Sequence, residues 1–203
     1  MTHRSYPSAR ILQRVNDRVP VGQTMPLRAV YMIRVLSIGK ETYHSNHELC
    51  MVARAFGASE LIFSSKKDPR LTKLVRSNNK KWGGSFSVGF EPDYMKVLDS
   101  NNNYKSVYLT RYGMPLQDVI GTLRTYKNLV LIVTNKEAFG PAYTKADFSV
   151  SITAQPHSSV SAIAVFLHEF YSGRELAMRF ENARYKVIPS EQGAHIEESD
   201  HTK

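Results

Sequence analysis

The residues of this chain best suited to hold a ligand lie between an apolar strand, predicted over 148–152, and a helix, predicted over 160–171. The loop that joins them, Thr153 to Ser158, is polar. Ser158 or Ser159 can cap the helix, and the first backbone N–H groups of a capped helix point into the preceding loop. A helix start at the C-terminal edge of a sheet suits an anionic or polar ligand group. An ordinary strand–turn–helix unit explains the same pattern equally well.

His157 stands next to Ser158, a pair that occurs in hydrolases. A Ser–His hydrolase also needs a third group to orient the histidine and a Gly-x-Ser-x-Gly turn around the serine, and the sequence has neither. We therefore expect His157 to fix the loop or to contact a ligand. The seven histidines show no zinc-like spacing, so no metal is expected.

Two more polar loops are predicted at the same edge of the sheet. They follow the predicted strands 104–110 and 129–133, at residues 109–113 and 134–138. The third is the loop 152–159. Because the carboxyl ends of parallel strands meet at one sheet edge, the three loops are expected to lie together there.

Strands that alternate with helices must position these loops. The pattern predicts an α/β domain with a mostly parallel sheet and helices on both faces. A Gly-x-Gly-x-x-Gly segment is missing after the first strand, which argues against a dinucleotide-binding fold. The predicted strands are 30–36, 60–63, 86–90, 104–110, 129–133, 148–152 and an edge strand 184–188. The predicted helices are 46–56, 69–81, 113–126 and 160–171, with a short helix or turn over 137–145.

Length and charge limit the possible functions. The 203 residues fit a single domain, predicted over 28–190, between a basic extension (1–27) and a polar tail (191–203). The extension is expected to be partly ordered, as an RNA-touching arm or as an unstructured tail. The formal net charge of +9 favours a polyanionic partner.

Targeting signals and cysteine chemistry are also limited by the sequence. It contains no apolar run long enough for a membrane span and no apolar segment of a signal peptide near Met1, so a cytoplasmic protein is expected, without a membrane partner. The single cysteine, Cys50, stands between apolar residues and is expected to be a small core residue.

The predicted helix 69–81 has two different faces. An apolar stripe is opposed by a basic face of four residues, Arg70, Lys73, Arg76 and Lys80. Such a face follows an RNA backbone or simply faces solvent.

Four segments, in this order, resemble one family: Val52-Ala-Arg-Ala-Phe-Gly-Ala58, Lys81-Trp-Gly-Gly84, Leu109-Thr-Arg-Tyr-Gly113, and the stretch from Ala154 to Leu167 that begins Ala-Gln-Pro-His-Ser-Ser. The family is the archaeal tRNA (cytidine-56)-2'-O-methyltransferases, a branch of the SPOUT methyltransferases. The resemblance covers roughly residues 30–190. It implies a C-terminal trefoil knot, S-adenosylmethionine as cofactor, tRNA as substrate and a homodimer.

The resemblance also assigns the three loops to cofactor binding, with Leu109 packed against the cofactor. Two loops depart from the family pattern, because Thr134 and Thr153 stand where the family usually has glycine. A threonine restricts φ and adds bulk at these positions. The implied cofactor-binding residues are Leu109, Thr134, Asn135, Lys136, Glu137, Ala138, Ile152, Thr153, Ala154, Gln155, Pro156, His157, Ser158 and Ser159.

The catalytic residue implied by the resemblance is Arg54, within the Ala-Arg-Ala-Phe-Gly motif. The two arginines that the family carries after the first strand are replaced here by the segment from Ser37 to Glu41. Pairing with a carboxylate or packing on the helix is the alternative role of Arg54. Candidates for positioning RNA are Lys40, His44 and His47, with Arg34 as a weaker one. The alternative functions are a knotted RNA-binding protein that has lost methyl transfer, and a methyltransferase that acts on another RNA.

Overall fold

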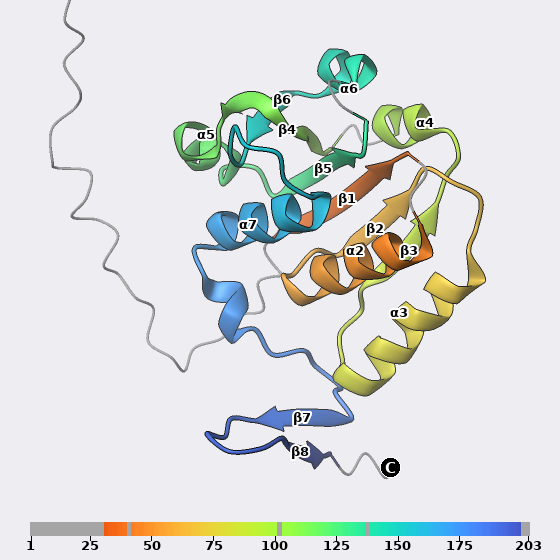
Figure 1. Ribbon diagram of the computed structural model, residues 1–203, viewed down its shortest axis with the longest axis vertical. Helices are drawn as coiled ribbons and strands as arrows, with labels where there is room; N and C mark the ends of the chain where they lie inside the picture. The colour runs from red at the N-terminus through yellow and green to blue at the C-terminus, as the bar shows by residue number, and fades with distance from the viewer. Residues whose placement is uncertain (1–30, 40–41, 101–102, 137–138, 200–203) are drawn as a thin grey trace, which may run out of the picture.

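The centre of the computed structural model is a sheet of six parallel strands in the order β3-β2-β1-β5-β4-β6 (Figure 1). The structure describes residues 31–39, 42–100, 103–136 and 139–199. The predicted parallel α/β sheet is confirmed. Its strands are β1 (Met32–Ile38), β2 (Glu60–Phe63), β3 (Ser87–Phe90), β4 (Lys105–Pro115), β5 (Asn128–Thr134) and β6 (Phe148–Ser151).

Helices cover both faces of the sheet, as predicted. Because successive strand residues point to opposite faces, the apolar strands feed two separate cores. The larger core lies under α2 (Tyr43–Ala55), α3 (Pro69–Trp82), α5 (Leu116–Leu123) and α7 (Ser159–Tyr171). The smaller core lies under α4 (Tyr94–Asp99) and α6 (Gly140–Lys145).

Four of the helices begin at a side chain that accepts a hydrogen bond from a backbone N–H of the first turn. These N-caps are Thr42, Asp68, Asp93 and Ser158. The cap at Thr42 explains why α2 begins three residues before the predicted start. The cap at Asp93 starts α4, which the sequence analysis did not predict because its six residues are too short for a periodic pattern.

The largest error concerns the predicted helix 113–126. Strand β4 continues to Pro115, and α5 covers only Leu116–Leu123. The reason is tertiary: Met114 and Pro115 pair with Val150 and Ser151 of β6, so strand pairing overrides the local helical pattern.

The C-terminal segment also differs from the prediction. The predicted edge strand 184–188 does not join the main sheet: β7 (Tyr185–Ile188) pairs antiparallel with β8 (His195–Glu198) in a separate hairpin. Between α7 and this hairpin lies a short 3-10 helix, η2 (Arg174–Ala177). Strand β8 lies within the predicted polar tail 191–203, and the predicted extension 1–27 lies outside the described residues. The predicted domain limits stay a prediction.

Candidate functional site

The three predicted ligand segments lie at the same edge of the sheet on neighbouring strands. Two of them are loops, as predicted, whereas residues 109–113 lie within the end of β4. Strand β4 pairs with β5 on one side and with β6 on the other, all in parallel. The strand order changes direction next to them, between β1 and β5. Ligands of open α/β sheets bind outside the carboxyl ends of the strands at such a reversal. The predicted convergence of the loops is therefore confirmed.

The end of β4 is held closely against β6. Leu109 and Met114 both pair with Val150, with a register shift between them. A Cβ atom added to Gly113 would lie 2.5 Å from the backbone carbon of Ser149 and from the nitrogen of Val150, so only glycine allows this approach. Leu109 is buried, while Met114 is exposed. The first segment is thus a tight backbone crossing with an apolar side chain on its inner side.

The second and third loops are braced by the threonines that replace the family's glycines. Thr134 Oγ1 accepts a hydrogen bond from the N–H of Lys136, at 3.1 Å. Thr153 Oγ1 accepts one from the N–H of Gln155, at 3.3 Å. Neither threonine has a positive φ. The backbone at these two positions therefore does not require the conformational freedom of glycine. Each threonine hydroxyl closes its own turn.

The second loop also contacts the loop that follows β1. A Cβ atom on Gly39 would overlap Asn135 Oδ1, so the asparagine side chain lies directly against this glycine. Lys136 is exposed, and its ammonium lies 5.3 Å from the centre of the Phe139 ring. The predicted site residues Glu137 and Ala138 lie outside the described residues.

The loop after β6 is exposed and internally hydrogen-bonded. Residues 153–158 are all exposed, and Ser158 caps α7 through the N–H of Ser161. His157 Nδ1 lies 2.8 Å from the carbonyl oxygen of Gln155. A carbonyl only accepts, so this hydrogen bond requires a proton on Nδ1. The expectation that His157 fixes this loop agrees with this contact.

Arg54 lies at the other edge of the sheet. Helix α2 runs from the end of β1 back to the start of β2, and Arg54 is next to its last residue. Its Nη2 donates to the carbonyl of Gly83 at 2.7 Å and its Nε to Asn79 Oδ1 at 3.3 Å. The guanidinium also lies 4.5 Å from the centre of the Phe180 ring. Burial lowers the pKa of Arg54. The catalytic role stays a prediction, and these contacts fit the alternative of a packing role.

The predicted RNA-binding side chains differ in the contacts that they make. Lys73, Arg76 and Lys80 are exposed along α3. Arg70 is held by Asp68 at 2.7 Å and lies 4.3 Å from the centre of the Tyr43 ring. Two further candidates are on α2. His44 contacts Glu48 at 3.2 Å, and the ring of His47 lies 6.2 Å from that of Tyr43. Lys40 lies outside the described residues.

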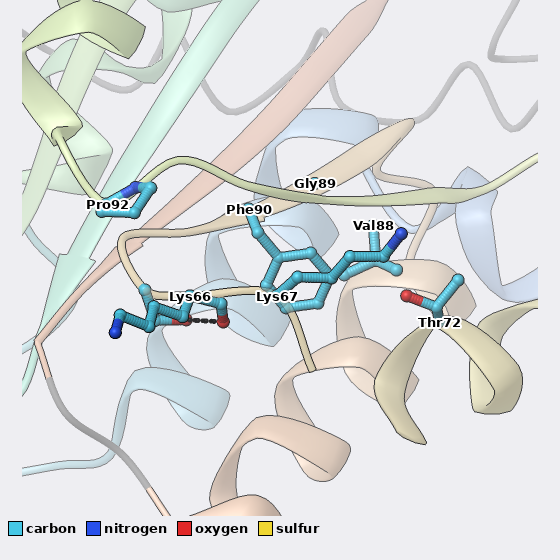
Figure 2. Close-up of a pocket in the computed structure, with 8 residues that line it drawn as sticks. Lys66, Lys67, Thr72, Val88, Gly89, Phe90 and Pro92 are labelled. Carbon is cyan, nitrogen blue, oxygen red and sulfur yellow. Dashed lines mark hydrogen bonds between the residues drawn. The ribbon is translucent and has the colours of Figure 1, made fainter. Parts of the chain in front are cut away.

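A cavity of about 450 Å³ lies beside the start of α3 (Figure 2). It was not predicted from the sequence. Its lining residues come from the loop after β2, from α3 and from β3: Ser65, Lys66, Lys67, Thr72, Val88, Gly89, Phe90 and Pro92. The adjacent pair Lys66-Lys67, shortly after the predicted strand 60–63, is the feature of the sequence that could have indicated this site. A smaller cavity of about 340 Å³ includes Arg34 and Glu60, which form an ion pair at 3.0 Å.

No described helix has the length and apolar character required to cross a bilayer. No group of three or more metal-binding side chains occurs within residues 31–39, 42–100, 103–136 and 139–199.

Comparison with known proteins gives consistent matches. Residues 82–197 match the sequence model of the family described as "tRNA ribose 2'-O-methyltransferase, aTrm56". A tRNA (cytidine(56)-2'-O)-methyltransferase of Methanothermobacter thermautotrophicus is 38% identical over 175 residues, which cover 83% of this chain and 97% of the relative. The enzyme of the same name from Methanobrevibacter smithii is 34% identical over 169 residues, covering 82% of this chain and 93% of the relative.

The fold is also similar to a solved structure, that of the SpoU methyltransferase AviRb from Streptomyces viridochromogenes in complex with AdoMet. The TM-score is 0.55 at 21% sequence identity, and the match covers 70% of this chain and 58% of AviRb. At this identity the likeness concerns the fold alone. The six-stranded parallel sheet is thus similar in fold to that of AviRb, whereas the trefoil knot stays a prediction.

Proposed function

The chain belongs to the tRNA ribose 2'-O-methyltransferase family, and on this basis we propose that it transfers a methyl group from S-adenosylmethionine to the 2'-hydroxyl of cytidine 56 in tRNA. The observation that carries the proposal is the match to a tRNA (cytidine(56)-2'-O)-methyltransferase along 97% of that enzyme's length. A tRNA substrate also agrees with the net charge of +9. A location in the cytoplasm is part of the same proposal.

The proposed cofactor site consists of the end of β4 and the loops after β5 and β6. They supply what an adenosine requires: exposed backbone groups in the segments 134–136 and 153–158, and the apolar side chain of Leu109. The residues present therefore fit the cofactor. When bound, the cofactor supplies a methyl group on a positively charged sulfur. The chain itself contributes fixed turns, through Thr134, Thr153 and His157, so that few loop conformations must be frozen on binding.

Methyl transfer forms a bond between the ribose 2'-oxygen and the methyl carbon and breaks the bond from that carbon to sulfur. The hydroxyl proton must leave to a base, because a neutral hydroxyl is a poor nucleophile near pH 7. Arg54 stays the predicted catalytic residue from the family motif. In this subunit it lies at the opposite sheet edge, so a role in the reaction requires an RNA or a second subunit that reaches it.

The proposed RNA-binding surface includes the exposed basic face of α3. Lys73, Arg76 and Lys80 have no ion-pair partner among the described residues, so they are available for phosphates. The ion pair with Asp68 makes Arg70 the weakest contributor of this face.

A homodimer is also proposed. Most apolar residues of α7 are buried inside one subunit, so they are not available to a partner. Val165 on α7 and Met51 on α2 remain exposed on two helices that pack together. They are candidates for a subunit interface, and light scattering after gel filtration measures the oligomeric state.

The test is transfer of a tritiated methyl group to a tRNA transcript by the purified chain. We expect incorporation into the normal transcript and none after cytidine 56 is replaced by 2'-deoxycytidine. Equal incorporation into both would reject the site assignment and favour another nucleotide or another RNA.

The alternative, an RNA-binding protein without methyl transfer, rests on the arginines missing after the first strand. Calorimetry with S-adenosylmethionine separates the two functions. A clear binding heat together with methyl incorporation rejects the alternative. Binding of tRNA without cofactor binding would support it.

A further inference from the structure

The cavity beside α3 has the chemistry of a nucleotide site. Figure 2 shows Lys66 and Lys67 pointing in opposite directions from the loop after β2, with Phe90 and Val88 on the strand behind them and the Thr72 hydroxyl facing the same space. Cations thus stand at the rim, and an aromatic ring with an aliphatic neighbour forms the floor. The volume of about 450 Å³ is large enough for one nucleotide.

The charges around the cavity favour an anion. Both lysines are exposed, and neither has an ion-pair partner among the described residues. The nearest carboxylate in sequence, Asp68, is already bound by Arg70 at 2.7 Å. Glu91 and Asp93, on either side of Pro92, accept hydrogen bonds from backbone N–H groups, at 2.9 and 3.1 Å, and neither forms an ion pair with the two lysines. The two ammonium groups are therefore left to a ligand from solution.

The aromatic floor is rigid. The ring of Phe90 stacks on the buried ring of Phe63, with centroids 5.8 Å apart and planes inclined by 27°. A ring supported in this way offers its remaining surface without loss of side-chain freedom, which favours stacking or edge contact with a base.

The cavity lies at the same sheet edge as the cofactor loops. Its residues lie in the loop after β2, in the first turn of α3 and at the end of β3, and the cofactor segments lie at the end of β4 and after β5 and β6. From β2 to β4 there are three strand spacings, which correspond to about 15 Å. A strand of RNA with its reacting ribose at the loops can reach this distance with a nucleotide close to the target.

We propose that this cavity is a second RNA subsite, which holds one unstacked nucleotide near the methylated one, with the phosphates on its two sides at Lys66 and Lys67 and its base against Phe90. The inference rests on the proposed function, because it assumes an RNA substrate at the loops. It explains how a tRNA loop, whose bases can be splayed out, is recognised beyond the target ribose.

The first experiment measures tRNA binding without the methyl donor, by fluorescence anisotropy at several salt concentrations. The variant Lys66→Ala/Lys67→Ala is expected to bind roughly tenfold more weakly, with a salt slope smaller by about 2. The control is Lys127→Ala, an exposed lysine before β5 at the opposite sheet edge. Unchanged affinity of the double variant, or an equal loss in the control, would overturn the subsite.

The second experiment tests the base contact with a T-loop RNA hairpin that carries one abasic nucleotide at successive positions around the target. One position is expected to weaken binding roughly tenfold in the original chain and to have no further effect in Phe90→Leu. Circular dichroism checks that this variant is folded. Equal losses in both proteins at every position would reject the contact.

Two further outcomes keep the explanations apart. Displacement of the RNA by millimolar cytidine monophosphate or phosphate, only while Lys66 and Lys67 are present, would assign the cavity to a free nucleotide and overturn the RNA subsite. A chain that binds tRNA through these lysines but transfers no methyl group would remove the proposed function and retain the subsite.

Discussion

The two halves of the sheet are built in different ways. In the β1–β2–β3 half, each strand lies next to the strand that follows it in sequence, with one helix between them. In the β5–β4–β6 half, the chain crosses from the outer edge at β3 to β4, returns to β5 and then passes to β6 beyond β4. The first half is a set of local units. The second half depends on contacts between distant segments, and it carries the proposed cofactor site.

The two halves differ in how closely their backbone segments approach each other. The β1–β2–β3 half is stabilised by ordinary side-chain packing and by the buried guanidinium of Arg54. The β5–β4–β6 half contains a backbone crossing at Gly113 that has no room for a single added carbon. We expect the second half to tolerate substitution least, and four predictions test this difference.

The largest effect is expected for Gly113→Ala. The new Cβ would meet backbone atoms of Ser149 and Val150, which cannot rotate away, so we expect a loss of about 3 kcal/mol in unfolding free energy. Urea denaturation followed by circular dichroism measures it. The matched control is Gly121→Ala in α5, where nothing lies within 4 Å and a gain of about 0.5 kcal/mol is expected. Equal stability of the two variants would show that the crossing at Gly113 does not require glycine.

Arg54 gives the next largest effect. Arg54→Ala leaves the Gly83 carbonyl without its donor and uncovers the Phe180 ring, for a loss of about 2 kcal/mol. Arg54→Lys should lose less, because an ammonium can still reach one acceptor. If Arg54 only packs, the kcat of the folded Lys variant stays normal. A stable Lys variant with a strongly reduced kcat would instead favour the predicted catalytic role.

Asp147 connects the starts of β4 and β6, and its loss should be moderate. Its carboxylate accepts hydrogen bonds from Lys105 Nζ at 2.7 Å and from the N–H of Ser106 at 2.8 Å. Burial raises the pKa of Asp147, but these donors outweigh it and hold the pKa below its usual value. We expect Asp147→Asn to cost about 1 kcal/mol at pH 7, reduced by solvent screening.

The pH dependence of this effect has a definite sign. A carboxyl with a lowered pKa stabilises the fold above its unfolded value of about 4, and the contribution disappears as the pH falls through the folded pKa. Denaturation at pH 7 and pH 2.5 should therefore show a smaller difference between the original chain and Asp147→Asn in acid. A constant difference would contradict the assignment.

The smallest effect concerns Cys50 in the β1–β2–β3 half. Burial raises the pKa of its thiol to about 12, so the folded chain should react very slowly with iodoacetamide at pH 8. The unfolded thiol ionises near pH 9 while the folded one does not, so stability falls as the pH rises above 9. Mass spectrometry of alkylated protein, with and without urea, measures this protection. Rapid labelling of the folded chain would show that α2 opens readily.

The two halves also differ in how well they were predicted. In the first half, strands β1, β2 and β3 lie within two residues of the predicted limits, because their runs of strand-forming residues mark these limits locally. In the second half the helix after β4 was predicted three residues early. Met114 and Pro115 take a strand conformation because β6, more than thirty residues later, pairs with them.

The candidate site shows the same division. Whereas the predicted loop 109–113 lies within β4, the loops after β5 and β6 were located from the sequence. The hydrogen bonds of Thr134 and Thr153, the burial of Arg54 and the cavity at Lys66 and Lys67 were not, because each depends on a neighbour that the sequence does not identify.

The sequence by itself determined the parallel α/β class, the family and the loops after β5 and β6, since these depend on periodicity and on motifs that lie within single segments. Only the tertiary structure decided the strand order, the crossing at Gly113 and the environment of each charged side chain. Strand order depends on which distant surfaces bury one another, and the environment of a charge depends on every atom around it.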